Sequence, residues 1–240
     1  MIQWGAIWGR PVKFSDRLLK AGFPVWEKIL RHPFVLGIGD GSLPMEPFKF
    51  YVCQDYVFLV DYARVLALAV TKGTRLPMMG KLAGLLHATL NTEMALHRSY
   101  CARFGIAAED LEATRPAPTT YAYTRHLLHT AASGSLGEIV GALFPCQWGY
   151  WEIGRRFAAE ESPGRPPLYT EWIKTYSSQE YGALAHWVRE LLDEQGESAS
   201  KEERARMETA FLTSSRYEYA FWEMAWRKEE WLEFSLRRSP

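Results

Sequence analysis

Alanine and leucine dominate the apolar positions of this 240-residue chain, where they outnumber valine and isoleucine by roughly three to one. Alanine and leucine favour helices, whereas valine and isoleucine favour strands. The alternation of apolar and polar residues that marks a half-buried strand is also missing. We therefore predict an all-α protein, folded as one compact helical bundle.

Charge and cysteine content exclude several classes of protein. Lys and Arg total 28, as do Asp and Glu, so the formal net charge is zero. A neutral chain that is 48% hydrophobic is expected to fold, and it lacks the basic surplus of a nucleic-acid-binding protein. No apolar run approaches the roughly 20 residues that cross a bilayer, and residues 1–20 do not read as a signal peptide. We expect a soluble, cytoplasmic protein with no nucleic-acid or membrane partner.

Helix-start and helix-stop residues divide the chain into eight predicted helices, over 15–32, 47–70, 76–104, 121–132, 136–160, 168–175, 179–194 and 200–234. Pro24 should disturb the first of them, and Gly105 should close the third. Segment 32–44 is interpreted as a turn-rich connector. Its glycines follow a GxGxG order, but no strand precedes them and the full spacing of a dinucleotide-binding loop is absent.

Asp55 is the first of three polar residues that are costly to bury. Helical spacing puts it on one face with Tyr51, Phe58 and Tyr62, in a segment that is otherwise apolar. A buried carboxylate without a partner costs several kcal/mol, so Asp55 either reaches solvent or holds a specific donor. A structural pair with an Arg or a Tyr accounts for Asp55 as well as a functional role does.

Cys146 follows Pro145 within a predicted helix. A proline inside a helix removes one backbone hydrogen bond and frees the carbonyl near Gly141, which should open the helix beside the thiol. Gly149 and Tyr150 should then place a gap and a phenol on the same side. A free cysteine is more often an inert core residue than a reactive one, and both interpretations stay open for Cys146.

Glu218 has Phe221 and Trp222 at helical spacing, so its face is aromatic. Burial raises a carboxyl pKa, which suits a group that passes protons near neutral pH, although a carboxylate satisfied by Arg or Tyr is equally consistent. A metal site is not expected, because no histidine has a glutamate three residues before it. Glu93 and His97 are four apart and form a plausible helical pair, but no second pair matches them.

Taken together, these residues resemble the thiaminase II (TenA) family. The resemblance extends over His32-Pro33-Phe34 and the following GIGDGSLP, Phe48-Lys49-Phe50-Tyr51, Gln54-Asp55, residues 93–98, Pro118-Thr119 with Tyr121 and Tyr123, Pro145-Cys146, Trp172-Ile173 with Tyr176, and Tyr217-Glu218-Tyr219 with Phe221-Trp222. It covers nearly the whole chain beyond the first dozen residues. It therefore implies a single domain over 1–240 with a heme-oxygenase-like fold, in which residues 1–12 form an N-terminal extension.

The resemblance also implies a reaction. Members of this family hydrolyse 4-amino-2-methylpyrimidines at the exocyclic methylene in thiamine salvage, releasing ammonia from the aminomethyl compound or the thiazole from thiamine. By position, Cys146 corresponds to the nucleophile, Glu218 to the proton donor, and Asp55 to the carboxylate that recognises the aminopyrimidine edge. Tyr123, Tyr150 and Tyr176 correspond to tyrosines that contact the substrate. The resemblance implies no cofactor. It implies assembly as a homotetramer.

Phe58 departs from the family pattern. The family commonly has a tyrosine three residues after the aspartate, credited with making the cysteine more nucleophilic, and that hydroxyl is missing here. Tyr62, one turn further along the same face, is a weak candidate to replace it. Loss of one such hydrogen bond costs about 1–3 kcal/mol, so we expect weakened or narrowed activity.

Two other functions stay open at this point. One is a pyrimidine-binding protein of the same fold with weak or no catalysis, which Phe58 favours. The other is a helical regulatory or interaction protein, suggested only by the ten tryptophans.

Overall fold

The computed structural model describes residues 12–160 and 162–232, and all regular secondary structure in those two ranges is helical. This confirms the predicted all-α class. The helices are α1 Phe14–Leu30, α2 Pro33–Asp40, α3 Met45–Lys72, α4 Leu76–Ala88, the π-helical turn η1 Thr89–Glu93, α5 Met94–Arg103, α6 Ala108–Glu112, α7 Pro118–Ser133, α8 Leu136–Ala158, α9 Pro167–Tyr176, α10 Gln179–Ser198 and α11 Lys201–Arg227. The proposed extension, residues 1–12, lies almost entirely outside the described residues.

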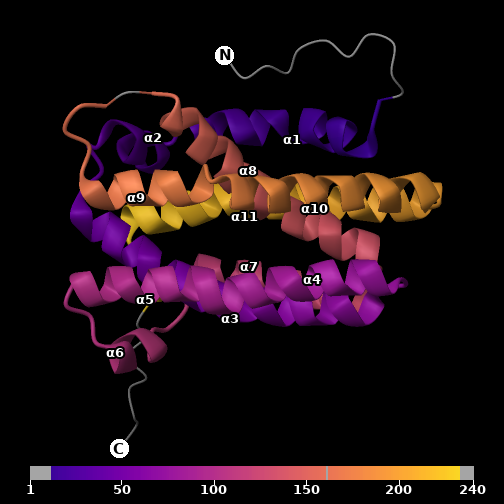
Figure 1. The fold of residues 1–240 in the computed structure, drawn as a ribbon, viewed down its shortest axis with the longest axis horizontal. Helices are drawn as coiled ribbons and strands as arrows, with labels where there is room; N and C mark the ends of the chain where they lie inside the picture. The colour runs from indigo at the N-terminus through magenta and orange to yellow at the C-terminus, as the bar shows by residue number, and fades with distance from the viewer. Residues whose placement is uncertain (1–11, 161, 233–240) are drawn as a thin grey trace, which may run out of the picture.

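The helices form a layered bundle. Figure 1 shows α1 and α2 along one side, α3, α4 and α5 along the opposite side, and α9, α10 and α11 between them. Helix α8 packs most extensively against α11 and α10, so it runs through the interior. No helix in the described part of the chain is long and apolar enough to cross a membrane.

Helix α8 begins with a capping box. The Ser135 hydroxyl accepts from the Glu138 amide at 3.3 Å, and the Glu138 carboxylate accepts from the Ser135 amide at 3.4 Å. These two bonds satisfy backbone groups that a helix start leaves free. Gly141 allows close packing on α11, because a Cβ there would lie 2.9 Å from the Met207 carbonyl oxygen. Pro145 lies within α8 and does not end it.

The prediction of a turn-rich connector over 32–44 is wrong, because α2 occupies Pro33–Asp40. The His32 ring nitrogen Nδ1 accepts from the Phe34 amide at 3.2 Å and so caps the helix, while Pro33 fits its first turn. Gly41 then ends the helix with φ of 87°. Glycine is typical of turns, but Gly39 serves close packing within the helix, since a Cβ there would lie 2.2 Å from the Phe157 ring.

Other parts of the helix prediction also differ from the structure. The predicted helix 76–104 is divided by η1 into α4 and α5, although Gly105 closes it as expected with φ of 74°. The short helix α6 was not predicted. Helix α11 ends at Arg227, before the predicted 234, because Lys228 adopts a left-handed conformation with φ of 52°.

Candidate active site

Asp55 and its neighbours on α3 form one wall of the candidate site. Tyr51, Asp55, Phe58 and Tyr62 are all buried, as their helical spacing predicted. The Tyr51 hydroxyl donates to Asp55 Oδ2 at 3.2 Å, and His97 Nε2 donates to the same oxygen at 2.8 Å. Asp55 is therefore held by a tyrosine, as one alternative proposed, and by a histidine that the sequence did not indicate.

His97 is held between two acceptors. Its Nδ1 lies 2.9 Å from the Glu93 carbonyl oxygen, and its Nε2 lies 2.8 Å from the Asp55 carboxylate. Neither oxygen can donate, so both contacts are satisfied when the ring carries both protons. Burial by itself lowers the pKa of His97, but the bond and the charge of Asp55 outweigh it, and the net pKa is raised. The raised pKa favours the doubly protonated ring, which can donate to both oxygens.

Cys146 projects from α8 and keeps accessible surface in a buried stretch. Every other residue from Gly141 to Tyr150 is buried, whereas Cys146 is half-buried. The predicted gap at Gly149 is filled, since a Cβ there would lie 2.2 Å from the Trp26 ring of α1. That part of the prediction is wrong.

Glu218 lies on α11 and is buried, with 3% of its surface exposed. The Tyr123 hydroxyl of α7 donates to Glu218 Oε1 at 2.7 Å. Burial raises the pKa of Glu218 to about 8, although the Tyr123 hydrogen bond opposes the rise. The carboxyl group is therefore able to gain or lose a proton near neutral pH.

Glu93 is a site residue that sequence reasoning considered only as a metal ligand. It ends the π-helical turn η1, and its Oε1 accepts from the Tyr176 hydroxyl at 3.2 Å. Burial and the Asp55 charge raise its pKa to about 7. The sequence did contain one signal, the Glu93/His97 spacing, but it did not show that both residues face Asp55.

The three carboxyl groups converge on the thiol. Burial raises the pKa of Cys146 well above its usual range, and the charges of Glu218, Glu93 and Asp55 raise it further. A thiolate is disfavoured beside three acids, so the resting group is the thiol. Helices α3, α8 and α11 and the turn η1 thus bring together one sulfur and three acids that are distant in sequence.

Aromatic side chains enclose this cluster. The Tyr150 ring lies 4.9 Å from the Tyr176 ring and 5.3 Å from the Trp222 ring. The Tyr51 ring stacks on Trp222 at 5.5 Å, and its hydroxyl accepts from Trp172 Nε1 at 3.2 Å. Such surfaces can sandwich a flat heterocycle.

Phe58, which lacks the hydroxyl of the usual tyrosine, lies among aromatic side chains. Its ring packs 5.0 Å from Tyr123 and 5.6 Å from Phe221. One turn away, the Tyr62 hydroxyl accepts from Gln147 Nε2 at 2.9 Å. Burial raises the pKa of Tyr62 well above its usual range, and an ionised Cys146 would raise it further.

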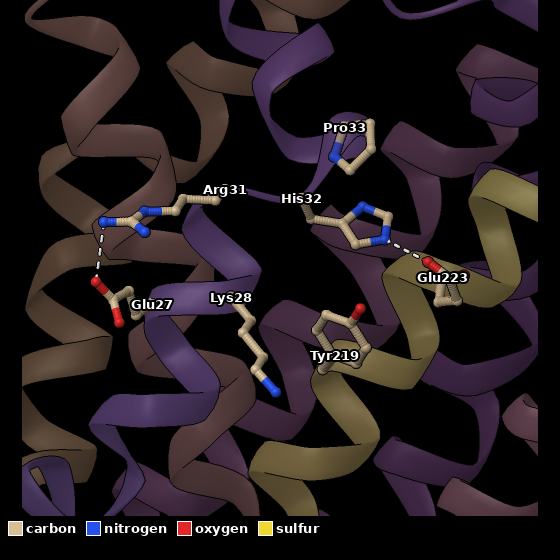
Figure 2. Close-up of a pocket in the computed structure, with 7 residues that line it drawn as sticks. All are labelled: Glu27, Lys28, Arg31, His32, Pro33, Tyr219 and Glu223. Carbon is tan, nitrogen blue, oxygen red and sulfur yellow. Dashed lines mark hydrogen bonds and ion pairs between the residues drawn. The ribbon is translucent and has the colours of Figure 1, made fainter.

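A separate pocket of about 400 Å³ opens where α1 meets α2. Figure 2 shows His32 and Glu223 joined across it, with Arg31, Lys28 and Tyr219 around them. The His32 ring nitrogen Nε2 lies 2.8 Å from Glu223, which fixes the start of α2 to α11. None of the residues that converge on Cys146 lines this pocket. Within 12–160 and 162–232, no three His, Cys, Asp or Glu side chains are arranged to hold a metal ion.

Comparison with known proteins identifies a family and named relatives. Residues 20–228 match the family model described as TENA/THI-4/PQQC. A protein of Halalkalibacterium halodurans named aminopyrimidine aminohydrolase is 47% identical over 220 residues, which cover 92% of this chain and 98% of that protein.

Solved structures agree with the fold. A TenA homologue from P. horikoshii superposes with a TM-score of 0.82 at 35% identity, over 90% of this chain and 99% of that one. A domain from Shewanella denitrificans with a heme oxygenase-like fold gives a TM-score of 0.69 at 18% identity, over 88% of this chain and 91% of that one. The expected heme-oxygenase-like architecture is therefore confirmed.

Proposed function

The chain belongs to the TENA/THI-4/PQQC family, and from that premise we propose that it is an aminopyrimidine aminohydrolase of thiamine salvage, with thiamine hydrolysis as a second activity. Its similarity to the H. halodurans protein of that name extends over nearly the full length of both chains. The observation that carries the proposal is the placement of the half-buried Cys146 thiol among Asp55, Glu93 and Glu218.

In the proposed first step, Cys146 Sγ forms a bond to a carbon of the pyrimidine ring. Ring electrons shift toward the exocyclic methylene, and its C–N bond breaks. The proton shared between Glu218 and the amine leaves with the nitrogen, so this group departs as neutral ammonia. The proton of the Cys146 thiol then takes its place on Glu218. A pKa of about 8 for Glu218 supports this exchange at neutral pH.

In the second step, water adds to the exocyclic methylene and forms the hydroxymethyl product. The C–S bond breaks as the ring regains its aromaticity, and the water proton passes through Glu218 back to Cys146. Overall, one aminomethylpyrimidine and one water give one hydroxymethylpyrimidine and one ammonia. Asp55, fixed by Tyr51 and His97, is suited to accept from the pyrimidine amino group. Tyr123, Tyr150 and Tyr176 are suited to contact the ring.

Product analysis tests the activity. The protein is incubated with 4-amino-5-aminomethyl-2-methylpyrimidine or with thiamine, and ammonia, hydroxymethylpyrimidine and thiazole are quantified. We expect stoichiometric ammonia and hydroxymethylpyrimidine from the first compound, and slower thiazole release from the second. Binding of both compounds without product over a long incubation would contradict the proposal.

That second outcome would select a pyrimidine-binding protein, which one observation favours. Phe58 stands where the family commonly has a hydroxyl, and the groups around the Cys146 thiol favour its protonated form.

Assembly as a homotetramer and a cytoplasmic location remain predictions. Light scattering that gives four times the mass of one chain would support the tetramer.

A further inference from the structure

Glu93 is placed by an unusual piece of backbone. The π-helical turn η1 interrupts an otherwise continuous α4–α5 segment and ends at Glu93. Such turns are rare, and they occur frequently at functional sites because they change the direction of the side chains that follow. Here the Glu93 carbonyl holds His97 at 2.9 Å, and its carboxylate accepts the Tyr176 hydroxyl. The backbone carbonyl and the side-chain carboxylate of Glu93 therefore both belong to the site.

The Glu93 carboxylate has capacity left for a ligand. Tyr176 donates to Oε1 at 3.2 Å, and no other side chain in the described part of the molecule donates to this carboxylate. The residue keeps accessible surface, as Cys146 does. A carboxylate has about four acceptor positions, so most of the acceptor positions of Glu93 are open.

Little positive charge offsets Glu93 and Glu218 in the described part of the site: His97 lowers the pKa of Glu93, but its ring is paired with Asp55. Asp55 is paired with His97 at 2.8 Å. Among the described residues, no lysine or arginine contributes to the surroundings of Glu93 or Glu218, and both acids have raised pKa values because ionising them there is costly. A cation bound beside the Glu93 carboxylate would lower that cost.

The proposed substrates carry such a cation, and the product does not. The aminomethyl compound has an ammonium group on the exocyclic methylene, and thiamine has a thiazolium at the same carbon. The hydroxymethyl product is neutral there. We infer that Glu93 is a specificity-determining residue whose carboxylate selects pyrimidines with a cationic substituent on the exocyclic methylene over the neutral hydroxymethyl compound. This inference rests on the proposed function.

Binding measurements test the inference apart from catalysis. In the Cys146→Ser background, calorimetry gives the Kd for thiamine, for the aminomethylpyrimidine and for the hydroxymethylpyrimidine. We expect the two cations to bind at least about 10-fold more tightly than the neutral compound. Adding Glu93→Gln should weaken both cations by about 10- to 100-fold and change the neutral compound by less than about 3-fold. Glu93→Asp should retain part of the preference.

Two controls separate selection from structural damage. Glu152→Gln changes a half-buried glutamate of α8 that pairs with Arg155, and it should leave all three Kd values unchanged. Calorimetry at pH 7 in buffers of different ionisation enthalpy should show that cation binding releases protons, and that Glu93→Gln releases fewer. Equal weakening of all three compounds by Glu93→Gln, or no weakening, would overturn the inference.

The two proposals fail in different ways. If the wild type prefers the cations but releases no ammonia, the hydrolase proposal is wrong and the selectivity of Glu93 stands. If the wild type releases ammonia and Glu93→Gln weakens cation and neutral compounds equally, the hydrolase proposal stands and Glu93 does not select charge.

Discussion

The protonation states of individual side chains decide how this site can react. Cys146 rests as a thiol because burial and three neighbouring acids oppose its ionisation. Reaction at this thiol therefore requires proton transfer through Glu218, to which the Tyr123 hydroxyl donates at 2.7 Å. The resting structure alone does not supply a thiolate.

Tyr123→Phe tests this dependence on Glu218. The hydrogen bond from Tyr123 lowers the pKa of Glu218, so its removal should raise that pKa above about 8. If Glu218 must hold a proton, the basic limb of the kcat/KM profile for the aminomethylpyrimidine should move to higher pH in the variant. The substrate amine ionises identically with both proteins, so the difference reports on the enzyme. An unchanged basic limb would show that Glu218 does not control it.

Phe58 and Tyr62 test whether a hydroxyl near Cys146 assists the thiol. Phe58→Tyr restores the hydroxyl that the family commonly has, and we expect kcat to rise by about 5- to 150-fold. Tyr62→Phe should lower kcat, because it removes the hydroxyl that Gln147, the residue after Cys146, holds at 2.9 Å. The double variant should recover at least the wild-type rate. A rate that is the same in all four proteins would exclude any contribution from either hydroxyl.

Most residues of the candidate site could be picked out from the sequence one at a time, but Glu93 could not. Asp55, Cys146 and Glu218 stood out because each is polar in an apolar or aromatic helix. Glu93 lies in a polar stretch with Asn91 and Thr92, where a charge is unremarkable. Only the π-helical turn brings it to the site, and no local sequence pattern announces that turn.

At the scale of single helices, glycine has opposite effects in different surroundings. Gly149 of α8 packs against Trp26, and Gly84 of α4 has open space around it. The same reasoning explains why 32–44 was predicted incorrectly. Glycines there permit helix packing against Phe157 and Leu43, but by sequence they are indistinguishable from turn glycines.

Two alanine substitutions test this contrast. Gly149→Ala should destabilise the protein by about 1–3 kcal/mol, because the added Cβ would lie 2.2 Å from Trp26. Gly84→Ala, also inside a helix, should stabilise it by about 0.5–1 kcal/mol, since alanine restricts the unfolded chain and meets no neighbour. Urea unfolding measures both. Stabilisation by both substitutions would show that helix propensity, not packing, decides the outcome at position 149.

For the whole molecule, the buried acids couple stability to pH. The pKa of Glu218 is raised from 4.5 to about 8, and that of Glu93 from 4.5 to about 7. The folded protein therefore binds more protons than the unfolded chain across this window. Their contribution to stability is complete below about pH 4.5 and is lost as the pH rises through about 8.

Unfolding free energies at pH 6 and pH 9 test this coupling. We expect the free energy of unfolding to fall by about 2–4 kcal/mol between the two. Glu218→Gln should remove more than half of that fall, because glutamine does not titrate. A free energy of unfolding that rises with pH in this range, or an unchanged fall in Glu218→Gln, would contradict the proton-holding role assigned to the site.

The central claim is that the Cys146 sulfur performs the chemistry, and the rate of ammonia release from the aminomethylpyrimidine tests it most directly. Cys146→Ser should lose at least about 10³-fold in kcat while still binding the substrate, because a serine hydroxyl is a far weaker nucleophile toward the ring. Cys53→Ser, which changes another half-buried cysteine, serves as the matched control and should keep the wild-type rate. Ammonia release by Cys146→Ser within about tenfold of the wild type would contradict the account.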